Sequence, residues 1–359
     1  MNKLDIPASR LPAKHVRISH AFEALHQAIK DIQYPLVLTG IGGTGKTSLC
    51  QDYYNNTDDK YQHKIWIPFQ VDIFNSLTAH TKLIENLQIE NFGKLTTQAE
   101  QLQQILYAIK AFEGKKLIVI DALDRKINGE EREFLLDLPN ELHATILISS
   151  RNNLKGFDEM PMPVMSVQDA KIIYAVYRDK ISVNTQKAHL IEVGFDMPHF
   201  STAEIELIQY AQRHPLLLEL IAKTINNDIS ITPKILLQKF TTYAPILSDE
   251  SIYISRTKKE KNIQEQLQII FEAVKLPEAQ RDILREISLL PSIQIPYEEL
   301  KTYIHKKERS HTFLQKNIQQ LINYGWLQRE GHSLQMHRAI QFTIDAVSYT
   351  HLTLPTIGE

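Results

Sequence analysis

The sequence predicts an α/β domain built on a parallel β-sheet, followed by a helical region and a smaller region of helices with a hairpin. Up to about residue 167, short apolar runs rich in Ile, Val and Leu alternate with longer amphipathic stretches, as in a doubly wound sheet. Beyond that point the apolar runs stop, and helical periodicity continues to about residue 245. A chain of 359 residues with 43% hydrophobic composition is long enough for two or three domains.

The predicted strands of the first region are short and apolar, as expected for strands that are buried on both faces of a sheet. They are PLVLTG, KIWIPFQ, KKLIVIDA, ATILISS and PVMSV, which begin at Pro35, Lys64, Lys115, Ala144 and Pro163. Between the second and third of them, the stretch TTQAEQLQQILYAIKAF predicts an amphipathic helix from Thr96 or Thr97 to Phe112.

Capping signals predict where the helices of the next region begin. Ser166 with Asp169, and Ser201 with Glu204, fit the capping box that opens a helix. Residues 243–261 are polar and charged, so we expect a linker there.

The third region begins near Ile263 and predicts three short helices, RDILREISLL, YEELKTYIHK and FLQKNIQQLINYG. A hairpin with Gly331 in its turn and a helical stretch from Arg338 follow. Three helices with a hairpin is the layout of a winged-helix domain.

We therefore expect four segments along the chain. The first three are a nucleotide-binding domain, a helical domain with its linker and a winged-helix domain. The last is a tail whose sequence resembles translated sequencing-adapter DNA, and we expect this tail to be non-native, with the gene truncated near Ala346. The expected boundaries are 1–165, 166–260, 261–346 and 347–359.

The bulk composition excludes several classes of protein. A net charge of −2 provides no field that would draw the chain to nucleic acid or to a membrane. The single cysteine, Cys50, excludes an internal disulfide framework, and no apolar run approaches the roughly 20 residues that cross a bilayer. The polar N-terminus lacks a secretory signal. We expect a soluble, cytoplasmic protein with no membrane partner.

A phosphate-binding motif lies between the first long predicted strand and the next helix. Residues 40–47 read GIGGTGKT and satisfy GxxxxGK[ST] in full. Glycines let backbone amides point inward toward phosphate, and the following helix adds its positive end. Lys46 would reach the β- and γ-phosphates, and the Thr47 hydroxyl would bind Mg²⁺. The predicted nucleotide-binding residues here are Gly40, Gly42, Gly43, Thr44, Gly45, Lys46, Thr47 and Ser48.

Two further polar residues end predicted strands. Asp121 follows the apolar run LIVI, where a carboxylate would hold Mg²⁺ beside Thr47. Arg151 follows ATILISS at the same predicted sheet edge, where it could reach a γ-phosphate. Many ATP-hydrolysing proteins place a second acid directly after such an aspartate, but here Ala122 follows and the next acid is Asp124. A capping aspartate and a solvated loop arginine are the structural alternatives.

Taken in order, these motifs resemble the NB-ARC family of STAND signalling ATPases over about residues 14–346. GIGGTGKTSL is similar to the phosphate loop of that family, LIVIDALD to its Walker B segment and ILISSR to its sensor strand. HPLLLEL, from His214, resembles the GLPL motif. LQMHRAIQ, which contains His337, resembles the MHD motif as it occurs in members with tetratricopeptide repeats.

The resemblance assigns roles that spacing does not. It implies that Pro215 packs near the nucleotide base and that His337 contacts the β-phosphate of ADP. It also implies that Val16 and Arg17 border the adenine. A loop that starts a helix and a histidine satisfied within the hairpin are the structural alternatives for Pro215 and His337.

The sequence departs from the family pattern at three places. Arg213-His214 replaces the glycine-rich start of GLPL, and Arg338 stands where the family has an aspartate. Ala122 stands where many members have a second acid, and the spaced acid Asp124 is instead similar to the NACHT group. That similarity implies that Asp124 serves catalysis. With Lys46 and Arg151, which are predicted to reach the phosphates, it completes the expected catalytic set.

The resemblance predicts a switch that binds ADP in an off state and ATP in an on state, with Mg²⁺ and slow ATP hydrolysis. We expect self-association of the ATP-bound form, and a repeat-type sensor domain in the full-length protein that is absent from this sequence.

Two other functions are considered. One is an ATP-controlled DNA-binding regulator that acts through the winged helix and the basic loop at residues 305–311. Its expected recognition helix carries only Lys316, whereas phosphate-driven affinity needs several cations, so we expect no nucleic-acid partner. The other is a small-molecule kinase or a motor ATPase. A kinase needs an arginine-rich lid, which the sequence does not show. Fast turnover of ATP would favour a motor.

Overall fold

The computed structural model describes residues 3–352 apart from residues 9–10, 13, 31, 182–196, 244–255 and 305–309. The chain divides into two compact units. The first unit consists of Met1–Leu11, Arg17–Gly40 and Gly45–Pro163. The second consists of Pro12–Val16, Ile41–Thr44 and Val164–Glu359. Whether residues 166–260 and 261–346 form separate domains stays a prediction.

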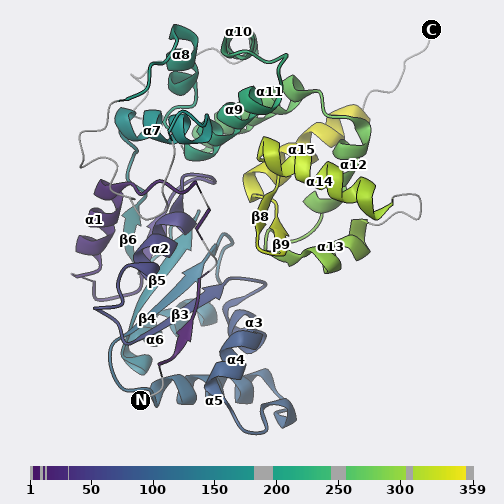
Figure 1. Cartoon of the computed structure of the whole chain (residues 1–359). Coiled ribbons are helices and arrows are strands. Elements are labelled where there is room, and N and C mark those ends of the chain that lie inside the picture. The colour runs from purple at the N-terminus through teal and green to yellow at the C-terminus, as the bar shows by residue number, and fades with distance from the viewer. Residues whose placement is uncertain are drawn as a thin grey trace. The chain divides into compact units, whose positions relative to one another are not determined.

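A parallel sheet forms the first unit and has six strands among the described residues. The strand order is β1-β3-β4-β5-β2-β6, and each neighbouring pair is parallel. Figure 1 labels β3, β4, β5 and β6 of this sheet. This confirms the predicted α/β class. The strands are β1 (Asp5–Ile6), β2 (Leu36–Thr39), β3 (His63–Pro68), β4 (Lys116–Asp121), β5 (Ala144–Ser150) and β6 (Asp158–Pro161).

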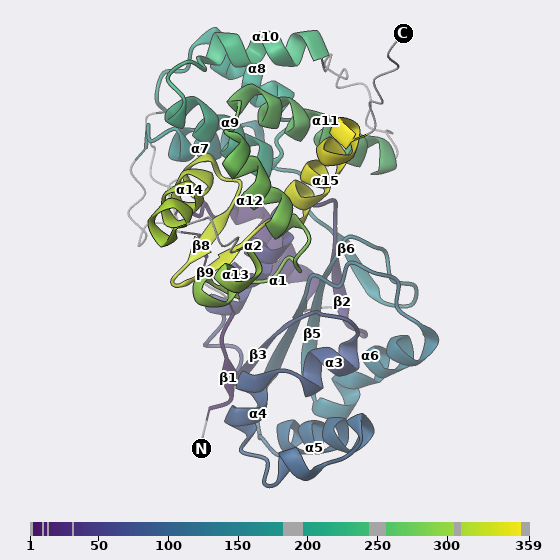
Figure 2. The same ribbon diagram turned by 90° about the vertical axis from the view of Figure 1, so that its right-hand side faces the viewer.

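Helices cover both faces of this sheet because alternate strand residues point to opposite sides. On β4, Leu117 and Val119 belong to one apolar cluster, which α1 and α2 complete. Ile118 and Ile120 belong to the other cluster, which α3, α4, α5 and α6 complete; Figure 2 shows these four helices together. The helices are α1 (Ser19–Ala28), α2 (Lys46–Asn55), α3 (Ile73–Thr78), α4 (Thr81–Leu87), the 3₁₀ helix η1 (Phe92–Lys94), α5 (Gln98–Lys110) and α6 (Gly129–Leu142).

The predicted helix starts are confirmed where a side chain caps the helix. Thr97 caps α5, so the helix begins one residue after the later of the two predicted starts. Ser166 and Ser201 form the predicted capping boxes with Asp169 and Glu204. Each box satisfies two backbone amides that would otherwise lack partners at the helix end.

The second unit is helical from Val167 to Tyr243 in the part that the structure describes. Its helices here are α7 (Val167–Tyr177), α8 (Thr202–Tyr210), α9 (Pro215–Asn227) and α10 (Pro233–Tyr243). The next helix is α11 (Arg256–Val274). No described helix of the chain combines the length and the apolar character needed to cross a membrane.

Short helices and a small antiparallel sheet make up the rest of the second unit. The sheet has the order β7-β9-β8, and Gly331 adopts a φ of 57° in the hairpin turn. The predicted helices and hairpin are present, and their assignment to a winged-helix domain stays a prediction. The elements are α12 (Glu278–Ser288), β7 (Ile295–Pro296), α13 (Tyr297–Ile304), α14 (His311–Tyr324), β8 (Gln328–Glu330), β9 (Ser333–Gln335) and α15 (Arg338–Leu352).

Two predicted element assignments are wrong. The strand predicted at residues 163–167 lies instead at Asp158–Pro161, where it pairs with β2. Pro163 has no amide to donate to a ladder, and Ser166 already caps α7. The predicted linker at 243–261 is also too long, because α11 begins at Arg256. Residues 244–255 of that linker and residues 353–359 of the predicted tail lie outside the described residues.

Candidate functional site

The phosphate motif forms the turn between β2 and α2. Gly43 and Gly45 have φ angles of 79° and 95°, in the left-handed region that side chains rarely adopt. Gly45 is the N-cap of α2, so the positive end of that helix lies at the loop. A Cβ atom on Gly43 would lie 2.6 Å from Cε1 of His214, so this position has no room for a side chain. The backbone is thus shaped as an anion-binding turn.

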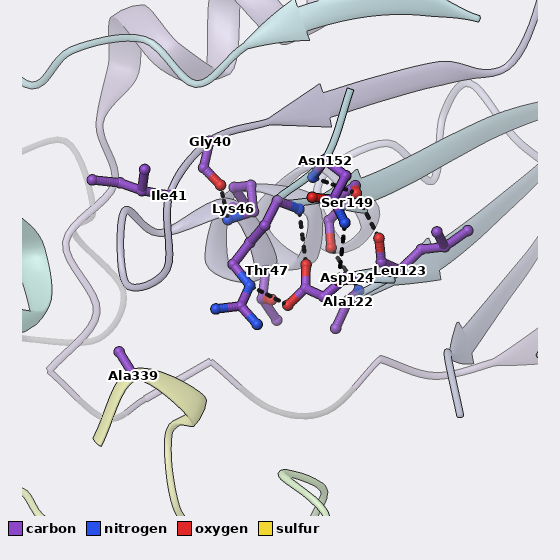
Figure 3. A network of polar contacts seen from close by, with 12 residues as sticks. Gly40, Ile41, Lys46, Thr47, Ala122, Leu123, Asp124, Ser149, Asn152 and Ala339 are labelled. Atoms are coloured by element: carbon purple, nitrogen blue, oxygen red, sulfur yellow. Dashed lines mark hydrogen bonds and ion pairs between the residues drawn. The ribbon is translucent and has the colours of Figure 1, made fainter. Parts of the chain in front are cut away.

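Lys46 is the first residue of α2, and its ammonium lies across the phosphate loop. Its Nζ donates a hydrogen bond to the carbonyl oxygen of Gly40 at 2.8 Å (Figure 3). The residue is only 8% exposed. A lysine charge held this close to the loop amides is positioned to meet a phosphate.

A hydroxyl and a carboxylate lie side by side where β2 and β4 end. Thr47 Oγ1 donates to Asp121 Oδ1 at 2.9 Å, and Ser149 Oγ donates to the same oxygen at 2.5 Å. The Ala122 amide donates to Ser149 Oγ at 2.8 Å. Oxygen ligands of this kind fit Mg²⁺. Among the described residues no group of three or more His, Cys, Asp or Glu side chains could hold a metal, so an ion here would take its other ligands from phosphate and water.

Burial raises the pKa of Asp121 above its usual value, while the hydrogen bonds from Ser149 and Thr47 act in the opposite direction. At pH values above the usual aspartate pKa, the ionised carboxylate of Asp121 therefore lowers the free energy of unfolding. This cost is absent once the group is protonated in both states. A cation bound beside Asp121 would offset this free-energy cost by stabilising the ionised carboxylate.

Replacing Asp121 by asparagine should change folding stability and metal binding in opposite directions. The amide oxygen can still accept from Thr47, and the buried charge is gone. Without nucleotide at neutral pH, we expect Asp121→Asn to raise the unfolding temperature by about 2–4 °C. Mg²⁺-dependent nucleotide affinity should fall. Thermal unfolding with and without Mg²⁺ and ADP measures both effects.

The gain in unfolding temperature should disappear at pH values below the usual aspartate pKa of about 3.9. There the carboxyl group of Asp121 is protonated in both the folded and the unfolded chain. The exposed Asp137 on α6 provides the control, because Asp137→Asn should change neither quantity. A lower unfolding temperature for Asp121→Asn would contradict the assigned cost of its charge.

Asp124 and Arg151 form a second pair at this edge of the sheet. The Arg151 amide donates to Asp124 Oδ1 at 2.8 Å, and Arg151 Nε donates to Oδ2 at 2.9 Å (Figure 3). Asn152 Nδ2 donates to the Asp124 carbonyl at 2.9 Å. Both carboxylate oxygens of Asp124 therefore accept hydrogen bonds from the residue predicted to reach the γ-phosphate.

The backbone between Asp121 and Asp124 is itself held in an unusual conformation. Ala122 has a φ of 64°, which a residue with a Cβ atom seldom adopts. Ser150 Oγ donates to the Leu123 carbonyl at 2.5 Å, and the Leu123 amide donates to the Ser149 carbonyl at 2.9 Å. The ends of β4 and β5 are thus joined by several hydrogen bonds that fix this turn.

The two residues predicted to border the adenine have different surroundings. Val16 packs against apolar residues of α7, in the cluster that contains Ile172 and Val176. Arg17 forms two hydrogen bonds with the Asp52 carboxylate of α2, at 2.8 and 2.7 Å. The structure thus gives Arg17 a partner within its own unit, and its role at a nucleotide base stays a prediction.

His214, which precedes the predicted Pro215, contacts the phosphate loop. Its Nε2 lies 2.8 Å from the carbonyl oxygen of Gly42, and the Leu216 amide lies 3.4 Å from the carbonyl oxygen of Gly43. His214 is 4% exposed. Pro215 is the first residue of α9, where a proline is well tolerated.

His337 lies at the start of α15. Its Nδ1 accepts a hydrogen bond from the Ala339 amide at 3.1 Å, and its carbonyl accepts from the Ile340 amide at 2.8 Å. The side chain therefore helps to begin this helix, and a role of His337 at the β-phosphate stays a prediction. Two other predicted residues have local roles: Thr44 Oγ1 donates to the Ile41 carbonyl at 2.9 Å, and Ser48 is half-buried on α2.

Sequence reasoning missed two residues that the structure brings to the site, Ser149 and His214. Ser149 lies in the segment ILISSR, and a hydroxyl near the end of a central strand was the available signal. His214 was visible only as a departure from a family motif. Neither residue is close in sequence to the group it contacts.

Comparison with known proteins finds similarities both in sequence and in structure. A family model described as an AAA domain matches residues 30–155. No curated protein sequence matches the chain. A STAND protein with a tetratricopeptide repeat sensor from Pyrococcus horikoshii has a similar structure, with a TM-score of 0.53 and 17% sequence identity. The similarity covers 94% of this chain and 43% of that chain, so this chain spans less than half the length of that protein.

Two further solved structures are similar at lower scores. Cdc6p from Pyrobaculum aerophilum has a TM-score of 0.37 at 14% identity, over 96% of each chain. A Walker-type ATPase of Pyrococcus abyssi has a TM-score of 0.36 at 14% identity, over 94% of this chain and 98% of that chain. At these identities the similarity concerns the fold alone. Over residues 30–155, which contain the phosphate loop, the chain is similar to an AAA domain.

Proposed function

We propose that the chain is a nucleotide-dependent switch of the STAND type, in the NB-ARC manner. It binds ADP in an off state and ATP in an on state, uses Mg²⁺ and hydrolyses ATP slowly. The observation that carries the proposal is the arrangement of Lys46, Thr47 and Asp121 at the carboxyl ends of β2 and β4. A phosphate loop, a mobile cation and a Mg²⁺-side carboxylate are the parts that nucleotide binding requires. The fold similarity to the STAND protein supports the choice of a switch.

The contact between His214 and Gly42 supports coupling between the nucleotide and the helices after α7. The loop backbone that would surround phosphates is the same backbone that His214 and Leu216 contact. A γ-phosphate that changes the loop therefore changes these contacts. Two arrangements that bind ADP and ATP with different affinity are what a population shift requires.

The proposed switch makes His337 the residue to test. We expect the purified chain to retain one equivalent of ADP and to turn over ATP slowly. If His337 contacts the β-phosphate, removing its ring should speed ADP release about tenfold. Stopped-flow displacement of a fluorescent ADP measures this rate. Rapid turnover by the unmodified chain would favour a motor ATPase instead.

The helix-capping role of His337 requires a matched variant. His337→Ala removes both the ring and the acceptor for the Ala339 amide, whereas His337→Asn removes the ring and keeps a capping acceptor. Both variants should release ADP faster if the ring contacts nucleotide. An effect confined to the alanine variant would trace to the lost cap and would rule out the locking role.

A DNA-binding function through the proposed winged helix gains no support from the described residues. Helix α14 carries one lysine, Lys316, and no arginine. Residues 305–309 of the predicted basic loop lie outside the described residues. Self-association of the ATP-bound form and a sensor domain in the full-length protein remain parts of the proposal for a switch.

A further inference from the structure

A cavity lies in the first unit, at the edge of the sheet where β4 and β5 begin. Its volume is about 460 Å³, and five basic residues line it: Lys30, Lys60, Lys115, Lys116 and His143. Its other lining residues are uncharged. We call it the basic cavity. Because parallel strands share one direction, this edge is opposite to the one that holds Lys46 and Asp121.

The fold explains why these residues meet. Lys115 and Lys116 stand at the start of β4, and His143 is the C-cap of α6, directly before β5. Lys30 and Lys60 follow the ends of α1 and α2. Helices of an α/β unit run back against the strands, so the ends of helices and the beginnings of strands gather at one edge. Residues far apart in sequence thereby line one space, and the positive charges of Lys30 and Lys115 both act on Lys60.

Lys116 is the unusual member of this group. It is 3% exposed, and the structure gives its ammonium no hydrogen bond or ion pair with any described residue. Burial lowers its pKa. On the neighbouring strand, Lys64 is also 3% exposed, but its Nζ donates to the Tyr54 carbonyl at 2.7 Å and pairs with Asp58. The Lys116 side chain lines the basic cavity, so an anion bound there would supply the partner that no described residue supplies.

The charges around Lys60 support the same conclusion. Burial lowers the pKa of Lys60, and the positive charges of Lys30 and Lys115 lower it further. Asp59 acts in the opposite direction. The Lys60 Nζ lies 3.4 Å from the Tyr53 hydroxyl, which is a neutral group. An anion in the basic cavity would reduce this repulsion.

We propose that the basic cavity binds a small phosphate-bearing anion, of the size of a diphosphate or a phosphorylated metabolite. A volume of about 460 Å³ lies within the range of small-molecule sites. Lysines act as point charges, and no arginine lines the cavity, so binding follows the charge of the ligand more than its planar geometry. The proposal does not rest on the switch function, because the phosphate motif contributes no residue to this cavity.

The test uses pyrophosphate as the probe, in a chain whose phosphate motif is disabled by Lys46→Ala. Calorimetric titration should give one equivalent of bound pyrophosphate. Adding Lys116→Met should weaken this binding about tenfold, because one charge-assisted contact is lost. Lys82→Met, at an exposed lysine on α4, should leave it unchanged. Lys116→Met removes a buried charge without a protein partner, so we expect this variant to fold.

A second measurement keeps the proposal open to refutation if Lys46→Ala fails to fold. The unaltered chain, saturated with ADP, should still bind one equivalent of pyrophosphate, and a ¹³C-labelled Lys116 ε-carbon should report a raised pKa on binding. If the unaltered chain binds no ADP, that result contradicts the proposed switch and leaves the pyrophosphate measurement on the basic cavity valid. The proposal is overturned if pyrophosphate does not bind, if Lys82→Met and Lys116→Met weaken it equally, or if citrate binds as tightly as pyrophosphate. Binding by a DNA duplex but not by pyrophosphate would also overturn it.

Discussion

Lys46→Ala is expected to abolish the binding of ADP and ATP, with a loss of at least about a hundredfold in affinity. The lysine is the only side chain of the motif that carries a full positive charge toward phosphate. Its Nζ already lies 2.8 Å from the Gly40 carbonyl oxygen, at the mouth of the loop. Calorimetric titration with Mg²⁺ and ADP measures the loss.

The control for this variant is Lys82→Ala, which removes the same charge from an exposed position on α4 of the same unit. It should leave nucleotide affinity unchanged. Circular dichroism should show that Lys46→Ala retains the helical content of the chain. Undiminished ADP binding by a folded Lys46→Ala chain would refute the nucleotide site itself.

Asp124→Asn is expected to slow ATP hydrolysis about a hundredfold if Asp124 orients the attacking water, with little change in ATP affinity. The structure raises a competing role, because both oxygens of Asp124 accept hydrogen bonds from Arg151. If Asp124 mainly positions Arg151, then Asp124→Asn and Arg151→Ala should both weaken ATP relative to ADP. Single-turnover kinetics and separate titrations with the two nucleotides distinguish these outcomes.

The double variant decides between the two roles. Residues that act through one contact give non-additive effects, whereas independent roles add. If Asp124 acts only through Arg151, the double variant should behave like Arg151→Ala alone. Asp137→Asn serves again as the exposed control. If Asp124→Asn alters neither hydrolysis nor nucleotide preference, the site mainly holds its nucleotide.

Much of the fold could be predicted from local sequence. β5 spans Ala144–Ser150, as the apolar run ATILISS indicates, and the capping boxes at Ser166 and Ser201 mark where their helices begin. These signals are contiguous and act within a few residues. β1 (Asp5–Ile6) was missed because two residues have no periodicity, and it exists only through pairing with β3. The shift of the last strand to β6 (Asp158–Pro161) likewise depends on pairing with β2.

The sequence by itself determined the phosphate loop, because GIGGTGKT carries its glycines, its cation and its hydroxyl within eight adjacent residues. It also placed Asp121 and Arg151 at strand ends. Only the tertiary structure decided that Ser149 shares an oxygen of Asp121 with Thr47 and that His214 contacts Gly42. Only the tertiary structure gathered the lysines of the basic cavity. These contacts join residues on different strands and helices, so they depend on strand register and helix packing, which no local stretch of sequence encodes.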